Sequence, residues 1–177
     1  MHFFNHVQSG SRWMFKKHRA RLLAQKEQVL VKGLKRRMAY LDRLLSIPML
    51  SEEWYREAYR PCPSNKQSMD ITPAYALLDE NTIRHMDVFL GNDYKAIYLI
   101  RDPADRAISS IKREAAGSVA EGIDYWIEKI CAHSVRARSD YRSTISRLDN
   151  ILGDRVLYLP FSMVKQNPKA LLRYVEK

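Results

Sequence analysis

Cysteine, glycine and long apolar runs are all scarce in this sequence of 177 residues. The two cysteines, Cys62 and Cys131, do not form a CxxC pair, which argues against a zinc site, and two free thiols are favoured over one disulfide. No apolar run approaches the ~20 residues that cross a bilayer. The first residues also lack the basic-then-apolar pattern of a secretory signal. We therefore expect a soluble, cytoplasmic chain without a zinc site or a transmembrane segment.

Acidic residues are few relative to basic ones. The chain has 30 Lys and Arg against 20 Asp and Glu, a net charge of +10. Such a surface attracts nucleic acid, anionic lipid, acidic glycans or a phosphorylated nucleotide, and charge alone does not choose among them. Hydrophobic residues make up 46 % and charged residues 28 %, which is typical of a globular chain rather than a disordered one. The length fits about one domain.

Leucine spacing dominates the first quarter of the chain. Leucines three, four or seven residues apart predict a helical stretch over residues 12–47 with one apolar face; they are Leu23, Leu30, Leu34, Leu41 and Leu45. Gly33 weakens the middle, so a pair of helices is an alternative. The many basic residues over 16–37 are either a solvated helix face, which we favour slightly, or a docking surface for an anionic acceptor or a membrane.

The remaining elements alternate between helix and strand. Residues 96–100 form a short apolar run without alternation, which is typical of a central parallel strand buried on both faces. The other expected elements are helices over 52–59, 78–90, 102–117, 123–133, 139–152 and 167–177, and strands over 67–71 and 155–159. Strands that alternate with helices favour an α/β layer with a parallel sheet.

Arg101 directly follows the strand over 96–100, at the sheet edge where parallel α/β proteins bind ligands. Asp102 and Pro103 predict a helix start there, and the first N–H groups of a helix attract anions. Arg106 and Ser109 project from the same helix, so the three side chains could converge on one phosphate. The alternative is that Asp102 and Pro103 only cap a helix and that Arg101 pairs with a nearby acid.

Residues 97–110, IYLIRDPADRAISS, resemble the 3′-phosphate-binding motif of sulfotransferases, an apolar strand followed by R-[DN]-P-x-x-R-A-x-S. Arg101 and Ser109 fall on the phosphate-binding Arg and Ser of that motif. Three other stretches resemble sulfotransferase segments in the expected order. They are residues 2–5 (HFFN), residues 54–55 with 70–75 (WY and DITPAY), and residues 154–168 (DRVLYLPFSMVKQNP). The basic stretch near 15–45 does not align.

This resemblance implies transfer of a sulfonate group from 3′-phosphoadenosine 5′-phosphosulfate to an acceptor hydroxyl or amine, without a metal. It implies a helix-rich, three-layer α/β/α domain with a short parallel sheet. The chemistry is an in-line displacement in which a base takes the acceptor proton and cations stabilise the leaving oxygen. His2 is a candidate for that base, and Pro73 and Tyr75 are candidates for lining the acceptor cleft.

A Gly-rich loop containing Lys, which holds the 5′-phosphosulfate in this family, does not occur in the sequence. We expect the chain to be a partial sulfotransferase domain over 1–177 that lacks the first strand and this loop. Residues 12–47 would be a basic helical insertion, and 67–177 the nucleotide-binding core. A fragment, a degenerate copy and a misassigned start are the three explanations.

The acceptor cannot be read from the loops, although a glycan is one option. A second hypothesis is a non-catalytic basic module that binds nucleic acid or an anionic glycan. We favour the donor nucleotide over nucleic acid as the partner, because no nucleic-acid motif is present and the stretch around Arg101 would go unexplained.

Overall fold

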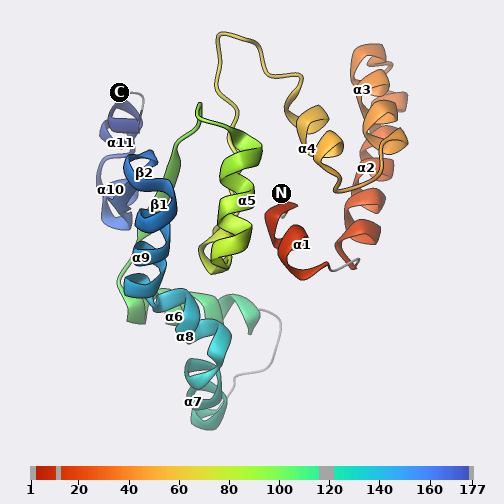
Figure 1. Cartoon of the computed structure of the whole chain (residues 1–177). Coiled ribbons are helices and arrows are strands. Elements are labelled where there is room, and N and C mark those ends of the chain that lie inside the picture. The colour runs from red at the N-terminus through yellow and green to blue at the C-terminus, as the bar shows by residue number, and fades with distance from the viewer. Residues whose placement is uncertain (1–2, 11–12, 116–121, 176–177) are drawn as a thin grey trace. The chain divides into compact units, whose positions relative to one another are not determined.

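The computed structural model describes residues 3–10, 13–115 and 122–175. The chain divides into two compact units, Met1–Leu78 and Asp79–Lys177, here called the N-terminal and C-terminal units (Figure 1). The boundary falls inside the stretch 67–177, so the proposed subdivision of the chain stays a prediction. No helix in the described part of the chain is long and apolar enough to cross a membrane.

Helices and connecting loops make up the described part of the N-terminal unit. Its elements are α1 (Phe3–Ser9), α2 (Trp13–Val31), α3 (Lys35–Ser46), α4 (Glu52–Tyr59) and the 3-10 helix η1 (Pro73–Leu77). The start of α4 is as predicted, because the Ser51 side chain accepts a hydrogen bond from the Trp54 N–H at 3.1 Å. The strand expected over 67–71 is wrong. This segment has no regular secondary structure and pairs with no described strand, and Thr72 then caps η1, which starts at Pro73.

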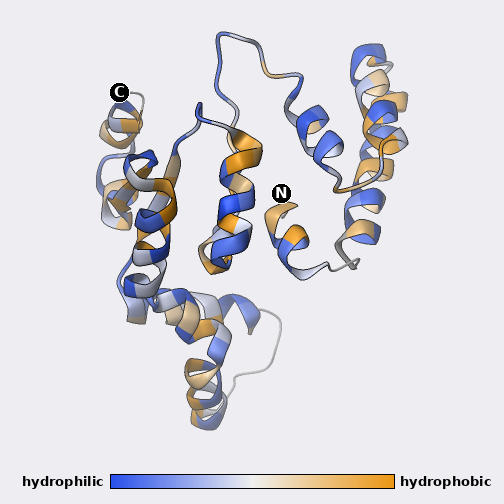
Figure 2. Ribbon diagram, viewed as in Figure 1, coloured by the Kyte–Doolittle hydropathy of each residue, from blue (hydrophilic) through white to orange (hydrophobic). Residues whose placement is uncertain are grey.

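The stretch over 12–47 is two helices, α2 and α3, which lie side by side and are joined by a turn at their upper end in Figure 1. Gly33 makes that turn with a φ of +64°, a conformation that costs other residues energy. The expected single leucine face is wrong. Leu30 and Leu34 are 69 % and 46 % exposed, whereas Leu41 is 2 % exposed, because the turn breaks the helical register between the two halves. Figure 2 accordingly shows hydrophilic and hydrophobic residues mixed along α2.

A short parallel sheet lies in the C-terminal unit. Its described elements are α5 (Glu80–Leu90), β1 (Ala96–Ile100), α6 (Pro103–Glu114), α7 (Ile123–Cys131), α8 (His133–Ser139), α9 (Tyr141–Leu152), η2 (Gly153–Arg155), β2 (Val156–Pro160), α10 (Phe161–Gln166) and α11 (Pro168–Val175). The prediction of β1 is confirmed, and that of β2 is correct to within one residue. The helix α10 was not expected. The helix-rich unit with two parallel strands is compatible with the predicted α/β class.

The two strands pair in register from Ala96 opposite Val156 to Ile100 opposite Pro160. Burial of β1 on both faces is wrong, because Ile97 and Leu99 are 39 % and 41 % exposed. Side chains alternate across a strand, and α9 contacts the other face: the Tyr98 ring lies 6.0 Å from that of Tyr141. The described elements therefore cover one face of β1 more fully than the other.

The helix α6 begins as predicted. Asp102 is its N-cap, with Oδ1 accepting a hydrogen bond from the Asp105 N–H at 2.9 Å, and Pro103 is the first helical residue. The helix ends at Glu114, and its expected end at Gly117 lies outside the described residues. Ile111 on α6 is fully buried, and it anchors the helix in the unit.

An ion pair connects the end of α5 to the start of β2. The Arg155 guanidinium contacts Asp87 and donates to its Oδ2 from Nη2 at 3.0 Å. The Tyr94 hydroxyl donates to Oδ1 of the same carboxylate at 2.7 Å. Burial raises the pKa of Asp87, but these hydrogen bonds and the positive charge of Arg155 outweigh burial and leave the pKa below its usual value. The ionised carboxylate therefore favours the folded chain.

Replacing Ile111 by Ala should lower the free energy of unfolding by about 2–5 kcal/mol, because it leaves a cavity under α6. Ile108→Ala is the matched control, since Ile108 lies one turn earlier on the same helix and is 40 % exposed. It should cost less than about 1 kcal/mol. Urea unfolding followed by circular dichroism measures both values. Equal losses for the two variants would contradict the described packing of α6.

The stabilisation from Asp87 should depend on pH. A carboxylate whose pKa is lowered by folding stabilises the protein above its unfolded pKa, near 4, and loses that effect as the pH falls through the folded pKa. The difference in unfolding free energy between the unmodified chain and Asp87→Asn should therefore be larger at pH 7 than at pH 3. Urea titrations at the two pH values test this. If this difference does not change with pH, the negative charge of Asp87 does not contribute to the free energy of unfolding.

Candidate functional site

Arg101 lies at the carboxyl end of β1, one residue before the N-cap of α6. Its side chain is 27 % exposed. Its guanidinium carbon lies 5.3 Å from the centre of the Phe161 ring, and its backbone N–H donates to the Tyr141 hydroxyl oxygen at 3.3 Å. A guanidinium within about 6 Å of the centre of an aromatic ring is attracted to the ring face. The structure therefore fixes Arg101 at the edge that the sequence predicted.

The side chain of Arg101 is only partly satisfied. Its Nη2 lies 3.7 Å from Oδ2 of Asp105, whose side chain is 62 % exposed. That distance is too long for a hydrogen bond, and an ion pair with a largely exposed partner contributes little. Its Nε is buried and has no hydrogen-bond partner among the described residues. An unpaired buried donor is costly, so this nitrogen favours an incoming acceptor.

Arg106 is the second cation of this edge. Its Nη1 is likewise buried without a partner in the described part of the chain, and its guanidinium carbon lies 5.9 Å from the centre of the Tyr141 ring. Burial raises the pKa of Tyr98, and the charges of Arg106 and Arg147 act in the opposite direction. Two arginines therefore lie at the carboxyl end of β1, in a segment that also carries the acids Asp102 and Asp105.

Ser109 is exposed and lies nearly two turns into α6, four residues after Asp105. Residues four apart share a helix face, so Ser109 follows Asp105 on the side where Arg101 makes its contact. The structure therefore keeps Arg101, Arg106 and Ser109 on one segment. Both interactions of the alternative interpretation are also present, namely the Asp102 cap and the contact between Arg101 and Asp105.

Two aromatic side chains at this edge were not identified from the sequence. Phe161 follows the last residue of β2, and Ile100 pairs with Pro160. Parallel strands in this register bring the residues that follow them to the same edge. Pairing the two predicted strands would therefore have placed Phe161 beside Arg101. Tyr141 had no comparable signal, because its position depends on how α9 packs against β1.

The motifs of the first half of the chain meet in the N-terminal unit. The Phe3 ring lies 4.7 Å from that of Tyr55, and the Phe4 ring lies 5.5 Å from that of Tyr75. Asn5 donates from Nδ2 to the Ala74 carbonyl at 3.3 Å. The segments HFFN, WY and DITPAY are therefore in contact, although up to 69 residues separate them. His2, the candidate base, lies outside the described residues.

Asp70 organises this cluster. Its carboxylate accepts hydrogen bonds from the hydroxyls of Thr72 and Tyr75, each at 2.7 Å, and from Tyr55 at 3.3 Å. Burial and the negative charge of Asp70 raise the pKa of Tyr55 and Tyr75 above the usual tyrosine range and that of Tyr59 to about 12. These hydroxyls therefore stay protonated at neutral pH and act as donors.

The two residues expected to line an acceptor cleft have different environments. Pro73 is exposed and begins η1. Tyr75 is partly buried, and its hydroxyl is bonded to Asp70. The contacts of Tyr75 fit a structural role, and whether either residue meets an acceptor stays a prediction. Both belong to the N-terminal unit, whereas Arg101 belongs to the C-terminal unit.

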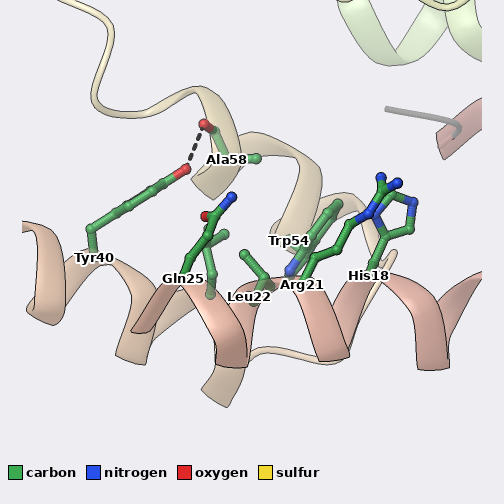
Figure 3. Close-up of a pocket in the computed structure, with 8 residues that line it drawn as sticks. His18, Arg21, Leu22, Gln25, Tyr40, Trp54 and Ala58 are labelled. Atoms are coloured by element: carbon green, nitrogen blue, oxygen red, sulfur yellow. Dashed lines mark hydrogen bonds between the residues drawn. The ribbon is translucent and has the colours of Figure 1, made fainter. Parts of the chain in front are cut away.

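A hollow of about 270 Å³ lies between α2, α3 and α4 (Figure 3). Trp54 forms part of its wall, and the indole Nε1 is buried without a partner among the described residues. The Tyr40 hydroxyl closes one side by donating to the Ala58 carbonyl at 2.9 Å. Polar groups reach the hollow from His18, Arg21 and Gln25. Among the described lining residues, Trp54 belongs to a sequence motif, and its indole is neither a nucleophile nor a base.

Within the described ranges, no group of three or more His, Cys, Asp or Glu side chains is arranged to hold a metal ion. Cys62 and Cys131 are free thiols, as the sequence favoured. No model of a known protein family, no curated protein and no solved structure matches this chain significantly.

Asp70→Ala should destabilise the chain by roughly 1.5–3 kcal/mol, because hydrogen bonds to a charged acceptor contribute about that much and three hydroxyls lose theirs. Urea unfolding of the full chain measures the loss. Asp93→Ala is the control, since Asp93 is exposed in a loop, and it should have an effect within about 0.5 kcal/mol. An Asp70 variant as stable as the control would contradict the organising role of this carboxylate.

Proposed function

We propose that the C-terminal unit binds the 3′-phosphate of a nucleotide at the carboxyl end of β1, and that the chain is part of a sulfotransferase. The observation that carries the proposal is the pair of buried guanidinium nitrogens, Arg101 Nε and Arg106 Nη1, that have no partner among the described residues. Both belong to a segment that resembles the 3′-phosphate motif. A phosphate offers oxygens that satisfy both nitrogens and outcompete the exposed Asp105 for Arg101.

The position of Arg101 supports the same proposal. A ligand at the carboxyl edge of a parallel sheet meets the first N–H groups of the following helix. Asp102 already caps one of these groups, the Asp105 N–H, so the helix alone is a modest anion site. We expect the two arginines to supply most of the affinity and Ser109 to add one hydroxyl donor.

The proposed donor is 3′-phosphoadenosine 5′-phosphosulfate. In the transfer, the acceptor oxygen or nitrogen attacks sulfur, the bond from sulfur to the bridging oxygen breaks, and the 3′,5′-bisphosphate nucleotide leaves. The acceptor proton passes to a base. The sequence contains no Gly-rich loop with Lys for the 5′-phosphosulfate. We therefore propose that these residues bind the nucleotide weakly and turn it over little, in a cytoplasmic setting and without a metal.

Calorimetric titration of the full chain with 3′-phosphoadenosine 5′-phosphate should give saturable heat. Arg101→Ala should weaken binding at least about tenfold, since a bidentate charge-assisted contact exceeds the 1.4 kcal/mol that corresponds to tenfold. Arg113→Ala is the control, because Arg113 is an exposed cation on the same helix and its loss leaves the phosphate contacts intact. Adenosine 5′-monophosphate, which lacks the 3′-phosphate, should bind as weakly to the unmodified chain as the bisphosphate binds to Arg101→Ala.

The absence of heat with the unmodified chain, or equal binding by the Arg101 and Arg113 variants, would refute the site. The alternative of a non-catalytic basic module makes a different prediction. In that case DNA or a sulfated glycan would bind in a salt-dependent manner, and Arg101→Ala would leave that binding unchanged.

A further inference from the structure

The turn between α2 and α3 exposes three large apolar side chains within five residues. Leu30 is 69 %, Val31 88 % and Leu34 46 % exposed. Single exposed apolar residues are common on protein surfaces. A cluster of them at the end of a helix pair is less common and is typical of an interaction site. Residues 30–37, which contain these side chains, are here called the hairpin tip.

Positive charge surrounds the apolar side chains of the hairpin tip. Four exposed basic residues lie within the tip, namely Lys32, Lys35, Arg36 and Arg37. The sequence from 28 to 41 contains no acidic residue. The nearest acids along the chain are Glu27 and Asp42, and Asp42 is paired with Lys26. The hairpin tip therefore combines an apolar end with four basic residues, none of which forms an ion pair with a described acid, although Arg36 lines a hollow that Glu57 also lines.

The helix pair holds these side chains outward. Val29 and Leu41 are buried just inside the hairpin tip, and Lys26 of α2 pairs with Asp42 of α3. The Gly33 N–H donates to the Leu30 carbonyl at 3.0 Å, and the Leu34 N–H to the Val29 carbonyl at 3.3 Å. The turn is thus closed by its own backbone, and the three apolar side chains stay exposed although Val29 and Leu41 beside them are buried.

We propose that the hairpin tip docks on an anionic lipid bilayer. Leu30, Val31 and Leu34 enter the boundary between headgroups and acyl chains, and the four cations contact lipid phosphates and carboxylates. A nucleic acid would use the cations and leave the apolar side chains in water. A bilayer surface satisfies both features. The proposal does not depend on nucleotide binding at Arg101.

Co-sedimentation of the full chain with vesicles tests this proposal. Binding to phosphatidylcholine vesicles that contain phosphatidylserine should exceed binding to phosphatidylcholine alone at least about tenfold, because each cation near an anionic surface adds to the attraction. Added salt should reduce binding. Equal binding to the two kinds of vesicle, or no binding to either, would overturn the proposal.

Variants separate the apolar from the electrostatic contribution. The triple variant Leu30→Ser, Val31→Ser, Leu34→Ser keeps every charge and should lose binding about tenfold or more, because it removes three large apolar side chains from the contact. Val31→Ser alone, at a side chain that is 88 % exposed, should fold normally and lose part of the affinity. Val88→Ser is its control, since Val88 is 83 % exposed in the other unit, and it should bind as the unmodified chain does.

A charge-matched pair tests whether location or net charge matters. Lys35→Glu with Arg36→Glu should abolish binding, whereas Lys16→Glu with Arg19→Glu changes the net charge equally at the other end of α2 and should retain most of it. Equal losses for the two double variants would overturn the proposal in favour of non-specific attraction. So would serine variants that bind vesicles normally, or a DNA duplex that binds more tightly than vesicles and depends on the same cations.

Discussion

The parallel pairing of β1 with β2 is the constraint on which the candidate site depends. Sixty residues separate the paired positions, for example Ile100 and Pro160. The register decides which side chains follow the two strands at one edge, and it places Phe161 under Arg101. The ion pair between Asp87 and Arg155 fixes the start of β2 against the end of α5. A slip of one residue would turn the strand side chains to the opposite face and remove Phe161 from Arg101.

The N-terminal unit uses a different device to bring distant segments together. The Asp70 carboxylate accepts hydrogen bonds from the hydroxyls of Tyr55, Thr72 and Tyr75. The rings of the two tyrosines pack on Phe3 and Phe4. An ionised carboxylate surrounded by donors is stable in a partly buried place because its hydrogen bonds replace the lost water. The same bonds hold the Thr72–Pro73 turn and give η1 a fixed start.

Local sequence patterns were sufficient to predict most of the helices and strands and the position of Arg101 at the end of β1. Asp102 is an N-cap as predicted, the helix expected over 52–59 has those bounds, and β1 has the predicted bounds, because caps and short apolar runs are encoded within a few residues. The wrong predictions concern which segments contact one another in the folded chain. The strand over 67–71 lacks a partner in the described part of the chain, and exposure of Ile97 depends on which elements cover the sheet. Tyr141 reaches Arg101 through tertiary packing, and the sequence contains no local signal for that contact.

The exposed face of the two-stranded sheet also has a consequence for colloidal behaviour. Ile97 and Leu99 stand out from a strand that has one paired edge among the described residues, and such an edge is a template for further strands. The net charge of +10 opposes close approach of two copies in dilute buffer. Salt shortens the range of that repulsion to ~10 Å at 0.1 M. Added salt should therefore favour association of chains through the exposed strand edge.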